Sequence, residues 1–465
     1  MTTYDIAIIG GGIVGCALAR ELAGRFKRVV LIEKESSVAQ HTSGRNSGVV
    51  HSGFNPHPGT LKAKFCVEGS REIRRYCAER KIACEQVGTW VVATEAEKIP
   101  ILHELKARGE KNGVLGLEVL PIESVKKLEP NVKGLQALYS PPGAIVDSRG
   151  LATAIAAEAG ERGATVMTAQ EVTGITERTD HVELQSQKET VRCELLINSA
   201  GLHADRLAHW MGVGRDLVIA PFRGEYFVVR RPVIRSMVYP VPHPVVPFLG
   251  VHLTKSIDGS VLLGPNAVPA FGREAYGPWN VNVRDMAQML SHRGVWNALA
   301  TNRTLVKIAW NEWRHSRSRR HFWREASKLV DGLRPDDLTL GQRVGIRPQL
   351  IRANGHLVED LVIETTPRSI HILNVVSPGM TSSIPFAKWV GSRISNDLRW
   401  SQPEEMVGTA CPLLNRFEAR GGGFYHVRRV WNHMKRWLSL SESEGTGHAC
   451  RLMNRLQVGR RTWRS

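Results

Sequence analysis

The N-terminal segment YDIAIIGGGIVGCALARELA, residues 4–23, constrains the fold more than any other part of this chain. An apolar run, a glycine cluster and then apolar residues at helical spacing predict a strand, a tight turn and a helix. Gly10, Gly12 and Gly15 fit the pattern G-x-G-x-x-G. One glycine allows the sharp turn, the next lets the backbone approach a pyrophosphate, and the third lets the helix pack closely on the strand.

A second apolar run, RVVLIEK, predicts the next strand and places Glu33 at its end. A carboxylate there can accept both ribose hydroxyls of an adenosine. The phosphates then lie at the helix N-terminus, where free N–H groups and the helix dipole favour negative charge. Strand, turn, helix, strand and acid in this order predict a Rossmann-like dinucleotide-binding domain, but the motif alone does not separate FAD from NAD.

Two later segments favour FAD. The stretch CELLINSAGLHADRLA predicts a buried strand that ends at Gly201, and such a strand end lies against the dinucleotide in two-domain flavoproteins. The stretch HILNVVSPGMTSSIPFAKWVG predicts a strand, a turn and a helix whose N-terminus can direct N–H groups at the flavin. That edge of the flavin becomes anionic on reduction. The residues expected at this helix N-terminus are Gly379, Met380, Thr381 and Ser382.

The predicted fold class is α/β, with a discontinuous FAD-binding domain and an α+β substrate domain. The FAD-binding domain is expected from residues 1–80, 144–212 and 340–400, and the substrate domain from residues 81–143 and 213–339. The strand-like runs TWVVATE, EYFVVRR and GSVLLGP predict a largely antiparallel sheet in the substrate domain. Residues 401–465 are expected to form a basic, partly flexible tail.

The chain has 62 Lys and Arg against 44 Asp and Glu, a net charge of +18 that favours anionic partners. No nucleic-acid-binding motif accompanies this charge, so nucleic acid is not an expected partner. The seven cysteines are scattered without a C-x-x-C pair, so neither a disulfide framework nor a metal site is expected. The sequence predicts no signal peptide and no membrane-spanning segment, and it favours a reducing compartment.

Several stretches resemble the L-2-hydroxyglutarate oxidase/dehydrogenase family within the D-amino-acid-oxidase-like FAD proteins. The resemblance covers residues 4–400 and is carried by IIGGGIVG, SGRNSGVVHSGF, PGTLKAKFC, GAIVDSRG, APFRGEYF, PFLGVHLTKSIDGSVLLGPNAV, VGIRPQ and TTPRSIHILNVVSPGMTSSIP. It implies oxidation of L-2-hydroxyglutarate to 2-oxoglutarate, with electrons passed from FAD to a quinone or oxygen. It also implies a cytoplasmic enzyme on the inner face of the bacterial membrane, or a mitochondrial matrix enzyme. The absence of a presequence favours the bacterial location.

Four residues depart from the family's usual pattern. The family often has histidine at Arg45, an aromatic residue at Asn55, lysine at Thr89 and alanine at Pro348. These positions lie near the expected active site, so the resemblance specifies the cofactor more firmly than the substrate and the acceptor. Another 2-hydroxy acid or glycerol 3-phosphate is the alternative substrate, and a non-catalytic, membrane-associated flavin-binding protein is the alternative from another class.

The glycine-rich loop SGRNSGVVHSGF is expected to contact the cofactor. Ser43, Arg45, Asn46 and Ser47 can reach the FAD pyrophosphate and ring. His51 can project toward the flavin and is the expected base, because an imidazole pKa of roughly 6.5 suits proton transfer near neutrality. The alternative is that His51 packs against the flavin without taking a proton.

The substrate's carboxylates need cations. Arg347 in VGIRPQ is expected to bind one of them bidentately, because related oxidases have a carboxylate-binding arginine at this place. Arg223 and Tyr226 are candidates for the second carboxylate or the pocket wall, and His252 is the second candidate histidine. Each of these residues has a structural alternative: a domain-interface salt bridge for Arg347, an ion pair within a strand for Arg223, and packing for His252. Asn266 is a weaker candidate, because an asparagine after Gly-Pro is often a turn residue.

Two basic, aromatic segments predict peripheral contact with an anionic membrane. Residues 296–329 hold eight Lys and Arg against two acids, with Trp310, Trp313, Phe322 and Trp323 among them. This composition suits an interfacial helix, or a solvated helix that covers the substrate domain. Residues 424–438 repeat the pattern with an apolar stripe at helical spacing.

Overall fold

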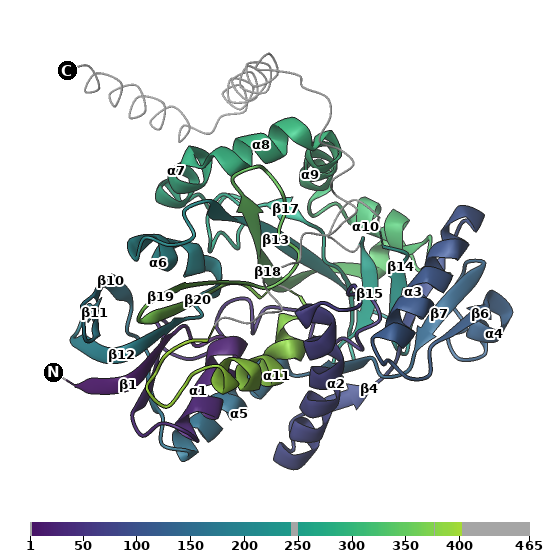
Figure 1. Cartoon of the computed structure of the whole chain (residues 1–465). Coiled ribbons are helices and arrows are strands. Elements are labelled where there is room, and N and C mark those ends of the chain that lie inside the picture. Colours follow the sequence, from purple (N-terminus) through teal and green to yellow (C-terminus); the bar gives the residue numbers. More distant parts are fainter. Residues whose placement is uncertain (1, 243–249, 376, 402–465) are drawn as a thin grey trace, which may run out of the picture. The chain divides into compact units, whose positions relative to one another are not determined.

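Two large β-sheets organise the chain in the computed structural model, which describes residues 2–242, 250–375 and 377–401 (Figure 1). The first sheet has eight strands and the second has nine. A third sheet joins β3 (Val49–Val50), β8 (Ala144–Val146) and β4 (Cys84–Gln86) in antiparallel pairs. The described residues contact one another as one compact unit. The expected tail, with its apolar stripe at residues 424–438, lies outside the described residues.

The first sheet contains the predicted dinucleotide motif. Its order is β10-β11-β12-β1-β2-β9, β20 pairs with β12, and β19 pairs with β20. The pairs β12–β1, β1–β2, β2–β9 and β12–β20 are parallel, as the predicted strand–helix–strand order requires. The strands are β1 (Thr3–Ile9), β2 (Val29–Ile32), β9 (Thr165–Met167), β10 (Val172–Glu177), β11 (Val182–Ser186), β12 (Thr190–Asn198), β19 (Val362–Thr366) and β20 (Ser369–Asn374).

Four helices pack together beside this sheet in Figure 1. They are α1 (Ile13–Ala23), α2 (Leu61–Arg80), α5 (Ser148–Glu161) and α11 (Gly379–Ser392). Side-chain caps begin two of them: Thr60 accepts from the N–H of Ala63 at 3.2 Å, and Asp147 accepts from the N–H of Gly150 at 3.0 Å. A Cβ on Gly69 of α2 would lie 1.9 Å from the carbonyl oxygen of Thr381, so glycine permits the close approach of α2 and α11.

The second sheet has the order β17-β13-β16-β15-β14-β5-β7-β6, and β18 pairs with β13. All its pairs are antiparallel except β14–β5, which confirms the largely antiparallel sheet. The three strand-like runs lie in β5, β13 and β16. The strands are β5 (Thr89–Ala93), β6 (Glu118–Pro121), β7 (Gln136–Ser140), β13 (Leu217–Val229), β14 (Met237–Pro240), β15 (His252–Lys255), β16 (Val261–Gly264), β17 (Val268–Pro269) and β18 (Leu338–Arg352).

One expected domain boundary is wrong. The boundary at residue 340 falls inside β18, which pairs with β13 from Leu217↔Arg352 to Val229↔Leu338. Residues 340–352 therefore belong to the second sheet. With this boundary moved past β18, we propose the same division into a FAD-binding domain and a substrate domain.

The remaining helices lie mainly in the segments between strands of the second sheet. They are α3 (Ile99–Lys111), α4 (Ile122–Lys126), α6 (Ala204–Trp210), α7 (Val283–Ser291), α8 (Arg293–Thr301), α9 (Arg303–His315) and α10 (Arg319–Ala326). Short 3₁₀ turns span Ala96–Lys98, Gly201–His203 and Pro335–Asp337. No helix among the described residues is both long and apolar enough to cross a lipid bilayer.

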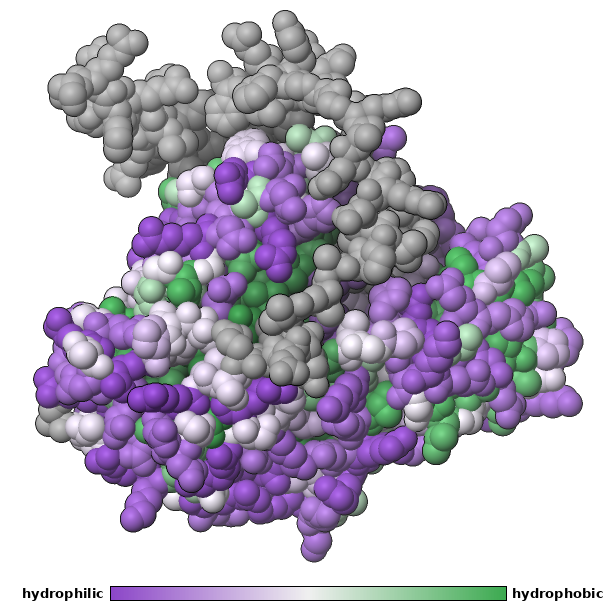
Figure 2. Space-filling view, in the orientation of Figure 1, coloured by the Kyte–Doolittle hydropathy of each residue, from purple (hydrophilic) through white to green (hydrophobic). Residues whose placement is uncertain are grey.

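The apolar cores explain part of the basic aromatic segment. Phe322 of α10 is fully buried, packs against Phe227 at 4.8 Å between ring centroids, and belongs to the core of the second sheet. Trp323 packs against the same core and donates from its indole N–H to the Leu333 carbonyl at 2.8 Å. The expectation that Phe322 contacts lipid is therefore wrong, because its ring is a core residue. Elsewhere the described surface in Figure 2 is mostly hydrophilic.

Candidate active site

The glycine turn between β1 and α1 has the geometry of an anion site. Gly10 has a φ of +106°, which favours glycine, and a Cβ on Gly15 would lie 1.9 Å from the Gly10 carbonyl oxygen. Gly12 is the N-cap of α1, and no side chain of its own caps the helix. Ser43 reaches this helix end and accepts from the N–H of Ile13 at 2.9 Å. A helix N-terminus that begins with glycine, beside close-packed glycines, suits a pyrophosphate.

Glu33 ends the strand β2, as predicted. Its carboxylate is 7% exposed and accepts from the N–H of Gly11 at 2.6 Å and the N–H of Glu35 at 2.8 Å. A carboxylate has about four acceptor positions, so the group retains capacity for ribose hydroxyls. The glycine turn and the acid therefore fit an adenosine dinucleotide on this edge of the first sheet.

The loop that follows is folded against itself and against the second sheet. Asn46 donates to the Ser43 carbonyl at 2.6 Å and accepts from the N–H of Gly48 at 2.8 Å. Arg45 donates from Nε to the Gln40 carbonyl at 2.8 Å. These two side chains hold the loop in shape, whereas Ser43 alone contacts the helix N-terminus.

A cavity of about 390 Å³ opens beside this loop. Its lining includes Gly44 and Arg45 from the loop, Arg149 from the start of α5, and Arg343 from β18. Arg343 also donates to the Asn46 carbonyl at 3.2 Å. The three guanidinium groups give the cavity a positive potential that suits an anionic group.

The other predicted cofactor contacts lie at the ends of β12 and β20. Gly201 begins a 3₁₀ turn after β12 with a φ of +53°. Gly379 begins α11, which confirms the predicted helix start, and Met380 follows it. Thr381 and Ser382 are buried in the first turn.

His51 lies against the start of α11. Its backbone N–H donates to Thr381 Oγ1 at 3.1 Å, and its Nε2 lies 3.4 Å from Ser377 Oγ. Burial, and then the charges of His252 and Lys62, lower the pKa of His51 to about 4. A neutral imidazole at pH 7 can accept a proton, which a base must do.

His252 comes from the first residue of β15 in the second sheet. Its Nδ1 lies 2.8 Å from the Gly250 carbonyl, and its ring stands edge-on to Tyr239 at 4.4 Å between centroids. Burial lowers the pKa of His252 to about 4. Tyr226 lies close to Tyr239, and burial raises its pKa to about 12, although a hydrogen bond with Ser47 acts in the opposite direction. The structure thus brings His51, His252 and Tyr226 into one region.

Arg347 projects from β18 into the same region. Burial lowers the pKa of Arg347 to about 10, so the guanidinium stays charged at neutral pH. Lys62, in the first turn of α2, was missed by the sequence interpretation. Burial and then the Arg347 charge lower its pKa, and its Nζ donates to the Glu359 carbonyl at 2.8 Å. The signal was available, because Lys62 lies within PGTLKAKFC, one of the stretches that carried the family resemblance.

Arg223 lies on the opposite face of the second sheet. Phe222 pairs with Arg347 and Arg223 with Ile346, and successive side chains of a strand point to opposite faces. Arg223 forms an ion pair with Glu225 at 3.2 Å and donates to the Gly277 carbonyl at 2.8 Å. The prediction that Arg223 joins Arg347 at a substrate is therefore wrong, because the pleat separates them.

Asn266 also takes part in this buried group and not in the candidate site. Its Oδ1 accepts from the N–H of Glu225 at 2.7 Å, and its Nδ2 lies 3.3 Å from Glu225 Oε2. Glu225 thus pairs with both Arg223 and Asn266 inside the fold. For Arg223 this is the ion pair within a strand that was the alternative, whereas Asn266 is a hydrogen-bond partner of Glu225.

The remaining residues make a site with a defined chemistry. Two neutral imidazoles, a guanidinium and an ammonium converge beside the first turn of α11. The imidazoles can take a proton, and the two cations suit a substrate with two negative groups. A dinucleotide-binding sheet with a parallel centre, a second, largely antiparallel sheet and this site define a two-sheet flavin oxidoreductase.

The comparisons with known proteins agree with this class. The family model described as FAD dependent oxidoreductase (DAO) matches residues 5–393, and the chain belongs to this family. The chain is 36% identical over 414 residues to the mitochondrial L-2-hydroxyglutarate dehydrogenase of Nematostella vectensis, covering 84% of this chain and 90% of that protein. It is 36% identical to the L-2-hydroxyglutarate dehydrogenase of Escherichia coli K12, covering 84% and 93%.

Among solved structures, the chain resembles FAD-bound, dithionite-reduced L-alpha-glycerophosphate oxidase from Mycoplasma pneumoniae. The TM-score is 0.65 at 26% identity, over 83% of this chain and 94% of that one. Glycine oxidase from Geobacillus kaustophilus shares the fold, with a TM-score of 0.63 at 19% identity over 83% and 93%. FAD is the cofactor of this family, and the glycine turn with Glu33 fits it.

Proposed function

We propose that this protein oxidises L-2-hydroxyglutarate to 2-oxoglutarate, acting on the CH–OH group with FAD as the hydride acceptor. The observation that carries the proposal is the similarity to L-2-hydroxyglutarate dehydrogenases, at 35–37% identity over most of both chains. The paired cations Lys62 and Arg347 support it, because the substrate has two carboxylates. Glycerol 3-phosphate, with one doubly charged anionic group, is the alternative.

Each residue has a proposed part in the reaction. Arg347 binds one carboxylate bidentately, and Lys62 binds the other as a point charge. His51 accepts the hydroxyl proton, because its lowered pKa keeps the imidazole neutral at neutral pH, with one ring nitrogen free to take a proton. His252 and Tyr226 form the wall of the site on the side of the second sheet. When bound, FAD accepts the hydride from the substrate carbon.

The proton leaves the hydroxyl oxygen and the hydride leaves the carbon that bears it, so the base must lie close to that oxygen. Thr381 Oγ1 accepts from the backbone N–H of His51 and so fixes the residue against α11. The sheet β3–β8–β4 holds the strand that directly precedes His51. The base is therefore held from both sides before the substrate binds.

The test is a comparison of kcat/KM among related substrates, with an artificial electron acceptor. L-2-Hydroxyglutarate should exceed L-2-hydroxybutyrate, which lacks the second carboxylate, and glycerol 3-phosphate by at least about tenfold each, since a lost charge-assisted hydrogen bond costs on the order of 1.5–3 kcal/mol. A higher kcat/KM for glycerol 3-phosphate would replace the proposed substrate.

We also propose that the protein binds anionic membrane reversibly on the cytoplasmic face and passes electrons to a quinone or oxygen. Phe322 and Trp323 pack in or against the core, so they do not support membrane binding. The support is Trp310, which is 56% exposed and stacks on Trp313, among the cations of α9. Each cation near an anionic surface adds about 1 kcal/mol. Binding to anionic vesicles that high salt reverses, with no binding to neutral vesicles, supports this location. Equal partition onto both lipids contradicts it.

A further inference from the structure

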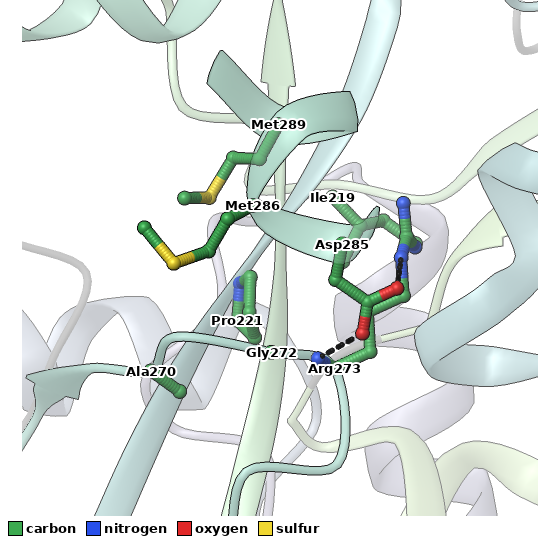
Figure 3. A pocket seen from close by; sticks show the side chains of 8 residues that line it. All are labelled: Ile219, Pro221, Ala270, Gly272, Arg273, Asp285, Met286 and Met289. Carbon is green, nitrogen blue, oxygen red and sulfur yellow. Dashed lines mark hydrogen bonds and ion pairs between the residues drawn. The ribbon is translucent and has the colours of Figure 1, made fainter. Parts of the chain in front are cut away.

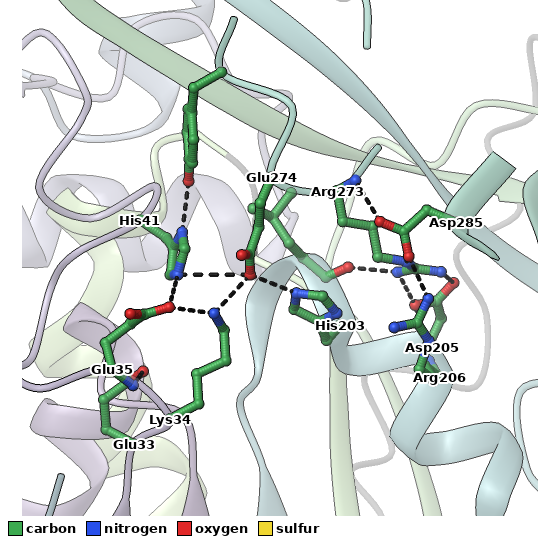
Figure 4. A network of polar contacts seen from close by, with 12 residues as sticks. Glu33, Lys34, Glu35, His41, His203, Asp205, Arg206, Arg273, Glu274 and Asp285 are labelled. Atoms are coloured by element: carbon green, nitrogen blue, oxygen red, sulfur yellow. Dashed lines mark hydrogen bonds and ion pairs between the residues drawn. The ribbon is translucent and has the colours of Figure 1, made fainter. Parts of the chain in front are cut away.

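The loop that connects β17 of the second sheet to α7 contacts the segment that follows β2 of the first sheet. Glu274 is the first residue of this loop to make such a contact. Glu274 Oε1 accepts from Lys34 Nζ at 2.8 Å and from His203 Nε2 at 2.8 Å (Figure 4). Lys34 directly follows Glu33 and also pairs with Glu35. The carboxylate of Glu274 therefore holds the residue next to the ribose-binding acid.

Tyr276 makes the second contact of this loop. Its hydroxyl lies 2.6 Å from Nδ1 of His41, and the two rings stack with centroids 5.9 Å apart. Nε2 of His41 donates to Glu35 Oε1 at 2.9 Å, so Nδ1 accepts from the tyrosine when His41 is neutral. The guanidinium of Arg45 lies 4.2 Å from the Tyr276 ring centroid. Tyr276 thus fixes His41 and Arg45, which flank Ser43 at the helix N-terminus.

The base of this loop is firmly anchored. Arg273 is 2% exposed and pairs with Asp205 at 2.5 and 2.9 Å, while its N–H donates to Asp285 at 2.9 Å. Asp285 in turn pairs with Arg206 of α6. Figure 3 shows Arg273 and Asp285 beside Met286 and Met289, where the hollow has no room for a water molecule. A loop with this base presents Glu274 and Tyr276 in fixed positions.

A metal ion is the other reading of this cluster, because one ligand atom from each of Glu35, His41 and Glu274 lies within 4.8 Å of the others. The ammonium of Lys34 already lies between the two carboxylates and supplies the cation. A divalent ion would have to displace it against charge repulsion. Glu35, His41 and Glu274 therefore form an ion-pair network with Lys34 and not a metal site.

We propose that Glu274 and Tyr276 are positioning residues that form a cofactor clamp, holding residues 34–45 around the adenosine and pyrophosphate of FAD and slowing its release. This role depends on FAD as the cofactor and not on which substrate is oxidised. The clamp connects Glu33 and Ser43, which are proposed to face the dinucleotide, to a loop base held by Asp205 of α6 and Asp285 of α7. The retained FAD is then coupled to the substrate domain.

The clamp is expected to respond to salt more than to pH. Burial alone would raise the pKa of Glu274, but the hydrogen bonds from His203 and Lys34 and the nearby His41 lower it to about 2. Burial would lower the pKa of Lys34, but Glu274 and Glu35 raise it above its ordinary value. The bridge between Lys34 and Glu274 thus stays charged from mildly acidic to alkaline pH, while added salt screens this half-exposed pair.

The test measures the rate of FAD release from holoenzyme after dilution, by the gain in fluorescence of free flavin. Glu274→Gln and Tyr276→Phe should each release FAD about 3- to 10-fold faster, the range for a half-exposed charged or neutral hydrogen bond. The matched control is Glu325→Gln on α10, which breaks a surface ion pair with Lys328 and should release FAD at the wild-type rate.

A double variant separates the clamp from a general loss of stability. Glu274→Gln combined with Lys34→Met should raise the release rate by less than the product of the two single effects, because both changes break the bridge between Lys34 and Glu274. Thermal unfolding at saturating FAD and kcat should stay at wild-type values. Wild-type release rates for both single variants, or rates that multiply in the double variant, would overturn the clamp. Tyr276→Phe removes one oxygen only, so it decides the matter if Glu274→Gln fails to fold.

Discussion

Lys62 of α2 and Arg347 of β18 lie close together, and burial and then the guanidinium charge lower the pKa of the lysine. Two cations that face one another in a partly buried site repel, and a substrate with two carboxylates relieves this repulsion. We propose that this arrangement serves substrate binding. It is the relationship on which the proposed substrate depends.

Replacing either cation should weaken binding of the dicarboxylate selectively. Lys62→Met should raise KM for L-2-hydroxyglutarate about tenfold and Arg347→Lys should lower kcat/KM about ten- to hundredfold, because each removes a charge-assisted or bidentate hydrogen bond. Lys64→Met is the matched control, since Lys64 is exposed two residues further along α2. Steady-state kinetics that are unchanged for Lys62→Met and Arg347→Lys would remove both residues from the substrate site.

Removing the proposed base should act on kcat. His51→Asn should lower kcat roughly 10²- to 10⁴-fold, the range for general base catalysis, while FAD content stays normal. His252→Asn should affect KM more than kcat if its ring is part of the wall. In the wild type, the acid limb of kcat/KM should lie near the lowered His51 pKa of about 4. An acid limb near pH 6.5 would indicate that another group, or a differently placed histidine, takes the proton.

Stability should fall on mild acidification because buried histidines must stay neutral. His51, His252 and His371 have pKa values lowered to about 4 in the folded protein, mainly by burial. Above pH 6.5 they are neutral in both states and contribute no pH dependence. Between pH 6.5 and 4 only the unfolded chain takes up these protons, so stability is lost as the pH falls.

At pH 5 this loss is on the order of 2 kcal/mol for each histidine, from about 1.4 kcal/mol for each pH unit below 6.5. Urea unfolding at pH 7.5 and pH 5 measures it. His371→Asn should reduce the loss of unfolding free energy between pH 7.5 and pH 5 by the amount that one histidine contributes. His57→Asn, at an exposed position, should leave this loss unchanged. An equal dependence in all three proteins would mean that these histidines are protonated in the folded state.

The dinucleotide turn has its own prediction. A Cβ on Gly12 would lie 3.1 Å from Ser43 Oγ, so the branched side chain of Gly12→Val fills the space at the helix N-terminus. Glu33→Ala removes the acceptor for ribose and for the N–H of Gly11. Both variants should purify with reduced flavin content, as measured by the ratio of visible to ultraviolet absorption. Full flavin content in both would contradict the placement of the cofactor.

The strand–turn–helix pattern could be read from the sequence because its signals are local. Gly10, Gly12, Gly15 and Glu33 are set by one turn and one strand end, and the start of α11 by the Ser-Pro-Gly turn. The position of residues 340–352 could not be read in this way, because membership in a sheet depends on pairing with β13, far away in the sequence. Local pattern therefore predicts elements better than their partners.

In the candidate site, too, residues in local motifs were predicted, whereas positions that depend on strand pairing or packing were not. Arg347 and His51 were predicted from motifs, whereas Arg223 was assigned to the same substrate although the register of β13 and β18 turns it to the other face. Lys62 was missed because a lysine in the first turn of a helix usually faces solvent. Its proximity to Arg347 is seen in the folded structure, where the Arg347 charge lowers the Lys62 pKa.

The most direct test of the account is an anaerobic single-turnover experiment with the purified holoenzyme. Mixed with excess L-2-hydroxyglutarate, the enzyme should lose its oxidised-flavin absorption and form one 2-oxoglutarate for each FAD, whereas D-2-hydroxyglutarate should leave the spectrum unchanged. An unchanged spectrum with the L-enantiomer, in protein that contains FAD, would contradict the central claim.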